Sequence, residues 1–218
     1  LKIPFNKFRI PPKELEEILP QQLLMLDVAD GAILDGRVSD NDRLNTSVII
    51  GIGLDLNTTN FHFRWMMRNR AKEIVKTSGL NITEQELDDL TNELMESAGP
   101  ALTANRTLGA LGGVVASRIA REFRLGGPSF TVSNEECSGL RAVETAVRLL
   151  QTKKVKQAIV GAVDLAGDVR SVLATHDKRP YSINGIARPF DQKADGPVPS
   201  EGAAAIILES LSSESIIS

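Results

Sequence analysis

The sequence has one cysteine, few aromatic residues and no long apolar run. A single cysteine among 218 residues, Cys137, excludes an internal disulfide framework and is consistent with a reducing compartment. Because no stretch of about 18 apolar residues occurs, no membrane span is expected. Aromatic residues make up only 4% of the chain, so the core must be built from aliphatic side chains and alanine.

The charge balance excludes a further class of protein. Lys and Arg total 25 while Asp and Glu total 28, and the basic residues are scattered along the sequence rather than clustered. This distribution argues against a nucleic-acid surface. Leu1 is not a start methionine and no signal peptide precedes it, so we expect a piece excised from a longer cytoplasmic protein. Its length suits one good-sized domain or half of a larger two-lobed one.

Short apolar runs alternate with amphipathic segments, which predicts a layered α/β fold. Runs of β-branched and small apolar residues predict buried strands at 46–53, 155–165 and 203–208, and a shorter strand at 129–133. Apolar periodicity predicts helices at 13–18, 21–34, 61–77, 83–97, 104–123 and after Cys137. Residues 166–197 are expected to be rich in loops.

Three of these helices carry packing expectations. The helix at 83–97 begins with a capping box formed by Thr83 and Glu86. The helix at 104–123 is rich in small residues, so we expect it to pack deeply beside the corner that carries Cys137. The side chains expected to face inward are Trp65, Met66, Met67 and Ile74 in the helix at 61–77, and Leu87, Leu90 and Leu94 in the helix at 83–97.

The stretch from Leu125 to Leu150 holds the residues best suited to chemistry. A β-prone run and a polar corner lead to Cys137, which is followed by an amphipathic helix. A thiol at such a corner lies at the positive end of the helix dipole, which favours the reactive thiolate. Glu135 and Glu136 oppose the thiolate if they face the sulfur. The residues alone leave two interpretations open, a nucleophile and a small buried apolar side chain.

The apolar side of the helix after Cys137 is expected to be buried. Its members recur at helical spacing. They are Leu140, Val143, Ala146, Val147 and Leu150.

Other candidate sites are weak. The glycines in the run 46–53 lack the dinucleotide-binding pattern, so nucleotide binding is not expected. His62 has no second histidine nearby, which argues against a metal site, and His176 lies in no catalytic motif.

Asp195 and Glu201 could serve as a general acid and base of the glycosidase kind. The alternative that we favour is a structural network around Arg188 and Asp191 that tethers the loop beneath the corner, because charged residues beside glycine and proline usually do so.

Three blocks of the chain resemble the β-ketoacyl synthases, the condensing enzymes of fatty-acid and polyketide assembly. The family usually has a Gly-Pro-Ser strand followed by an Ala-Cys-Ser-Ser-Ser-Leu turn. Glu136 departs from this pattern by standing where alanine is usual, and Gly139 departs from it in the serine run. The residues that agree are Gly127, Pro128, Ser129, Cys137, Ser138 and Leu140.

The other two blocks lie on either side of the first. Residues 182–191, 194–196 and 201–205 are similar to the family's Arg-Pro-Phe-Asp, Asp-Gly and Gly-Glu-Gly-Ala run, with Ser200 replacing one glycine. Residues 19–26 are similar to the family's Asp-Pro-Gln-Gln-Arg helix start. The blocks most resemble ketosynthase domains of polyunsaturated-fatty-acid and polyketide synthases.

The resemblance implies a thiolase-like layered fold, in which helices pack on a mixed β-sheet, and only its first half. Residues 1–211 are then the N-terminal half of a β-ketoacyl synthase domain. Residues 57–104 are a helical insertion near the active-site entrance and dimer interface, and 212–218 are a linker or the start of the second half.

The resemblance also implies a reaction. Cys137 takes an acyl group as a thioester, with its own backbone N–H as an oxyanion donor, and a malonyl-type extender on the phosphopantetheine of an acyl carrier protein decarboxylates and attacks it. Arg188, Asp191, Asp195 and Glu201 support the site, with no metal and no tightly bound cofactor. The family's two catalytic histidines lie in the second half, so this chain alone is not expected to complete condensation.

The expected partners are an acyl carrier protein, the C-terminal half of the domain, and a second subunit in a homodimer or ketosynthase-type heterodimer. Two alternatives remain open. One is a non-condensing partner like the chain-length factors, which usually lack the cysteine, and the other is an inactive thiolase-fold fragment.

Overall fold

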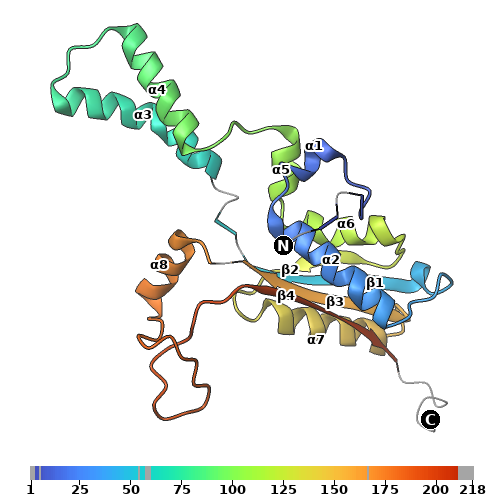
Figure 1. Ribbon diagram of the computed structural model, residues 1–218. Coiled ribbons are helices and arrows are strands. Elements are labelled where there is room, and N and C mark those ends of the chain that lie inside the picture. Colours follow the sequence, from blue (N-terminus) through green and yellow to red (C-terminus); the bar gives the residue numbers. More distant parts are fainter. Residues whose placement is uncertain (1–2, 5, 54, 57–59, 166, 211–218) are drawn as a thin grey trace.

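The computed structural model places four strands in one mixed sheet, in the order β2-β1-β3-β4 (Figure 1). It describes residues 3, 4, 6–53, 55–56, 60–165 and 167–210. The strands are β1 (Thr46–Ile52), β2 (Ser129–Val132), β3 (Gln157–Asp164) and β4 (Gly202–Glu209). Strand β1 is parallel to β2 and β3, while β4 is antiparallel to β3. The expected α/β fold with helices on a mixed sheet is confirmed.

Both faces of the sheet are covered by helices (Figure 1). On one face lie α2 (Pro20–Asp35) and α6 (Val114–Phe123), and on the other lies α7 (Ser138–Gln151). Successive side chains of a strand point to opposite faces. Val48 and Ile50 therefore join the core beneath α2 and α6, while Ile49 joins a second core with the alanines of α7. All residues of β1 are buried, as the apolar run predicted.

The expected helix at 104–123 is two helices, α5 (Ala104–Ala110) and α6. The chain turns at Leu111, Gly112 and Gly113, and the glycine pair explains the break because glycine is a poor helix former. One side chain binds three carbonyl groups at this break, two of which also accept a backbone N–H from Leu19 or Val114. The Gln22 amide nitrogen donates to the carbonyls of Leu108, Gly109 and Leu111 at 3.0, 2.7 and 3.2 Å.

Gln22 thus couples α2 to the turn between α5 and α6, and its own oxygen accepts from Arg118 Nε at 3.1 Å. We expect Gln22→Leu to lower the free energy of unfolding by about 2 kcal/mol, because the carbonyl of Leu108 loses its hydrogen bond and those of Gly109 and Leu111 lose one of two. Urea denaturation would measure the loss. Gln21→Leu removes a neighbouring buried amide that has no side-chain hydrogen bond in the described structure, and an equal loss in both variants would contradict this role.

Helices α3 (Asn60–Ser78) and α4 (Glu84–Ala98) pack on each other in a hairpin that projects from the body (Figure 1). The expected capping box between Thr83 and Glu86 is present. The expectation that Trp65 faces inward was wrong, since it is 77% exposed. Met66 and Ile74 are exposed as well, because the hairpin lies away from the sheet. The leucine stripe of α4 is half-buried, where the two helices meet.

Three further segments complete the fold. Helix α1 (Pro12–Leu15) and the short 3-10 turn η1 (Arg43–Asn45) precede α2 and β1 respectively. The expectation that 166–197 is rich in loops holds for 179–197, but 169–178 form a helix, α8 (Val169–Lys178), which buries no residue. The serine-rich segment 212–218 lies outside the described residues.

Candidate active site

Residues 133–137 form a tight hydrogen-bonded corner, which we call the elbow, between the edge strand β2 and helix α7. The Ser138 hydroxyl donates to the carbonyl of Glu135 at 2.6 Å and accepts from the N–H of Asn134 at 2.9 Å. Glu135 has φ of 49°, a left-handed conformation that non-glycine residues rarely adopt. The short strand and the turn therefore bring the chain abruptly into the first turn of α7.

Cys137 is the N-cap residue of α7, and its side chain is exposed. Cys137 thus stands at the positive end of a helix of 14 residues, and its side chain makes no capping hydrogen bond. Its own backbone N–H, the expected oxyanion donor, instead donates to the carbonyl of Asn134 at 3.0 Å. An oxyanion at Cys137 would therefore compete with a hydrogen bond of the elbow.

A cavity of about 350 Å³ opens beside the elbow, and we call it the elbow cavity. It lies where β1 and β3 end, which is the edge of an open α/β sheet at which ligands usually bind. Most of its lining residues are small. Glu135 and Glu136 line it, whereas Cys137 does not. The lining residues are Gly51, Gly53, Glu135, Glu136, Ser138, Gly139, Ala162, Val163, Asp164, Gly202, Ala203 and Ala204.

The charge at this cavity is acidic. Asp164 and the two glutamates of the elbow contribute carboxylates. The Glu136 carboxylate forms an ion pair with Arg179, the residue after α8, at 2.7 Å. Both side chains are more than half exposed, so the pair contributes little to stability, but it directs the Glu136 head toward α8.

Helix α7 meets the sheet with its small side chains. Ala142, Ala146 and Leu150 are buried. The expectation that Leu140 and Val147 lie on the buried side was wrong, since Leu140 is 73% exposed and Val147 is exposed too. Alanine lets the helix lie close to β1 and β3, and Leu140 and Val147 are left on the exposed side of the helix.

The four residues expected to support the site tether the segments that lead to β4. Arg188 donates to the carbonyl of Lys193 at 3.4 Å, and Asp191 accepts from the Lys193 N–H at 2.8 Å. Glu201 accepts from the Gly167 N–H at 2.9 Å. In the described residues these groups make separate local contacts, and none forms an ion pair with another.

Asp195 closes the same loop. It accepts from the Ile183 N–H at 3.2 Å and from the Asn184 side chain at 3.3 Å. A hydrogen bond with the Ser182 side chain, followed by those of nearby backbone amides, lowers the pKa of Asp195 below its ordinary value. The carboxylate is thus held ionised as an acceptor, which suits a loop tether.

The two histidines make local contacts. His176 in α8 accepts from the Tyr181 N–H at 3.1 Å through Nδ1, and His62 lies against the ring of Phe61 in α3. Across the described ranges, no cluster of side chains is suited to hold a metal ion. Nor does any helix in those ranges combine the length and the apolar content that crossing a bilayer requires.

Sequence reasoning did not identify three residues of the elbow cavity and its surroundings. Asp164 at the end of β3 and Arg179 after α8 have no motif that marks them. Gly51 does carry a signal, because a glycine inside a buried apolar strand often marks a close backbone approach. A Cβ at Gly51 would lie 2.6 Å from the backbone nitrogen of Gly139 and the carbonyl of Ser138.

Known proteins share both sequence and fold with this chain. Residues 4–214 match the family model described as β-ketoacyl synthase, N-terminal domain. The chain is 28% identical over 210 residues to a polyunsaturated fatty acid synthase protein of Thraustochytrium sp., covering 96% of this chain and 10% of that protein. It is 29% identical to "Highly reducing polyketide synthase easB" of Emericella nidulans, covering 94% of this chain and 7% of that protein.

Solved structures agree. "PfaC Keto synthase-Chain length factor" matches with a TM-score of 0.79 and 31% identity, covering 92% of this chain and 21% of that one. A ketosynthase from module 6 of the bacillaene synthase of Bacillus subtilis 168 shares the fold, with a TM-score of 0.63 and 22% identity over 94% of this chain and 29% of that one. The chain thus spans a small part of the relatives it matches. On its family match and its fold, this chain belongs to the β-ketoacyl synthase family, of which it represents the N-terminal domain.

Proposed function

We propose that this chain is the N-terminal half of a ketosynthase domain that works in fatty-acid or polyketide assembly. In this proposal the elbow cavity receives an acyl chain that a carrier protein delivers on phosphopantetheine. The observation that carries it is the elbow cavity itself, a hollow of about 350 Å³ beneath the N-terminus of α7 and bordered by the ends of β1 and β3. Its mostly small lining residues leave room for a slender chain.

The reaction we propose is decarboxylative condensation with Cys137 as the acyl acceptor. The Cys137 thiolate attacks the carbonyl carbon of an acyl thioester, and the pantetheine thiol leaves. A malonyl thioester then loses carbon dioxide, and its carbanion attacks the Cys137 thioester, releasing the 3-oxoacyl product and the thiolate. The exposed thiol at the N-terminus of α7 supports this role. The C-terminal half of the domain would supply the histidines.

A second candidate function is a non-condensing partner like the chain-length factors. Counted back without a gap from Leu140, the family turn Ala-Cys-Ser-Ser-Ser-Leu places its cysteine at Glu136, and Cys137 falls one residue later. Glu136 also lines the elbow cavity whereas Cys137 does not. A carboxylate at that position cannot hold the acyl thioester, so the domain would shape the cavity of a condensing partner.

Product formation separates the two functions. The whole protein that contains this chain is incubated with acyl- and malonyl-pantetheine thioesters, and 3-oxoacyl product and released carbon dioxide are measured by mass spectrometry and gas analysis. We expect product and carbon dioxide in equal amounts. If the Cys137→Ala protein forms as much product as the wild type, or product forms only after a separate ketosynthase protein is added, the second candidate holds.

A further inference from the structure

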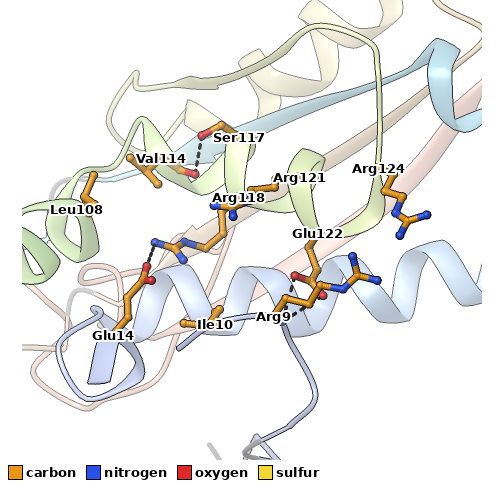
Figure 2. A pocket seen from close by; sticks show the side chains of 10 residues that line it. All are labelled: Arg9, Ile10, Glu14, Leu108, Val114, Ser117, Arg118, Arg121, Glu122 and Arg124. Atoms are coloured by element: carbon orange, nitrogen blue, oxygen red, sulfur yellow. Dashed lines mark hydrogen bonds and ion pairs between the residues drawn. The ribbon is translucent and has the colours of Figure 1, made fainter. Parts of the chain in front are cut away.

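The fold gathers arginines that are far apart in the sequence into one groove, which we call the arginine groove (Figure 2). Arg9 comes from the N-terminal arm, Arg118 and Arg121 from α6, and Arg124 from the residue that ends α6. The cavity measures about 450 Å³. A second cavity of about 560 Å³ shares Arg9, Glu122 and Arg124 with it and continues to Leu44 before β1, so the hollow surface is long.

Two charged side chains of the groove, those of Arg118 and Glu122, already have partners within the chain. Arg118 forms an ion pair with Glu14 at 2.6 Å, and both side chains are largely buried. The Glu122 carboxylate accepts the backbone N–H of Arg9 at 3.2 and 3.3 Å. The guanidinium groups of Arg9, Arg121 and Arg124 form no ion pair within the part of the chain that the structure describes, and all three residues are exposed.

We propose that the arginine groove docks an acidic, amphipathic segment of a partner protein. Charge complementarity favours an acidic partner, because three guanidinium groups lie unmatched on a chain whose net charge is −3. The walls also offer apolar surface. Leu108 at one end and Leu44 at the other are about half or more exposed, so apolar residues of the segment can pack between its carboxylates.

The arrangement of charges favours a segment over a compact phosphate. Figure 2 shows the Arg9 side chain extending past the Glu122 carboxylate toward Arg124, while Arg121 lies on the other side of Glu122. A single phosphate between Arg9 and Arg124 would leave the Arg121 guanidinium without a partner. Carboxylates spaced along a peptide can instead pair with Arg9, Arg121 and Arg124 separately and avoid Glu122. This docking does not depend on the chemistry at the elbow.

The test uses a fluorescein-labelled synthetic peptide of helical design, with glutamates on one face and leucines beside them, and fluorescence anisotropy as the readout. Arg9→Glu combined with Arg121→Glu reverses two exposed charges and should weaken binding about tenfold. The matched control is Arg68→Glu combined with Lys72→Glu on the exposed surface of α3, and it should leave binding unchanged. Thermal melts confirm that both double variants fold.

Two further measurements can overturn the proposal. Binding should weaken as salt rises from about 50 to 300 mM, since exposed charges are screened, and a peptide with lysines in place of the glutamates should not bind. Inorganic phosphate and coenzyme A are added as competitors. Displacement of the peptide by either at low millimolar concentration would show a phosphate site instead, and equal binding by the two double variants would exclude the groove.

Discussion

The wild-type chain should gain one acyl group when incubated with an acyl-phosphopantetheine thioester, whereas the Cys137→Ala chain should gain none. We expect this result because Cys137 provides the only thiol of the chain, exposed at the N-terminus of α7. Alanine removes the sulfur without disturbing the backbone of the N-cap, and the loss of the adduct should be complete. Intact-mass spectrometry measures it, with peptide mapping to confirm the position.

Two variants at Glu136 make the experiment decisive between the proposed functions. If Cys137 is the acceptor, Glu136→Ala should retain the adduct, because the Glu136 carboxylate forms an ion pair with Arg179 and the variant leaves the thiol in place. The double variant Glu136→Cys, Cys137→Ala places the thiol one residue earlier, on the wall of the elbow cavity. An unlabelled wild type together with a labelled double variant would contradict Cys137 as acceptor and establish the non-condensing partner.

The sheet could be predicted from the sequence because its strands are short runs of β-branched and small apolar residues bounded by polar segments. Residues 46–53 are short, apolar and rich in β-branched side chains, which favours a strand buried on both faces over a helix, and β1 is such a strand. The elbow was predictable for a similar reason, since a β-prone run, a polar corner and an amphipathic helix follow one another directly.

The wrong expectations concern apolar helix stripes, because the sequence does not show which part of the molecule packs against such a stripe. Trp65 and Leu140 each lie on an apolar helix stripe, yet both are exposed, because periodicity shows that a stripe exists and not which surface it meets. Helix α8 was missed although Asp168 caps it by accepting the Arg170 N–H at 2.7 Å. A helix that buries no residue gives only that local signal.

The arginine groove could not be predicted from the sequence, because its arginines come from distant parts of the chain. Basic residues appeared scattered because Arg9 and Arg121 are more than a hundred positions apart in the sequence. The packing of the N-terminal arm against α6, where Glu122 binds the Arg9 backbone, brings them to one cavity. Surface charge patterns of this kind depend on tertiary structure.

Replacing Gly51 with alanine should lower the free energy of unfolding by about 3 kcal/mol, the upper end of the usual cost of overpacking a core. The added methyl group would lie 2.6 Å from the backbone nitrogen of Gly139 and from the carbonyl carbon and oxygen of Ser138. These are backbone atoms in the first turn of α7, so no side-chain rotation can relieve the overlap. Either the helix start or the end of β1 must move.

Gly53→Ala is the matched control, because the nearest atom to its added methyl is Asp164 Oδ1 at 3.9 Å, an ordinary contact. Guanidinium denaturation should show a large loss for Gly51→Ala and a change within about 0.5 kcal/mol for Gly53→Ala. Losses that agree within error would mean that α7 adjusts freely against the sheet. If Gly51→Ala loses more stability than Gly53→Ala, the start of α7 can lie against β1 only because β1 has no side chain at position 51. A methyl group there would displace the elbow, so acyl loading should fall together with the free energy of unfolding.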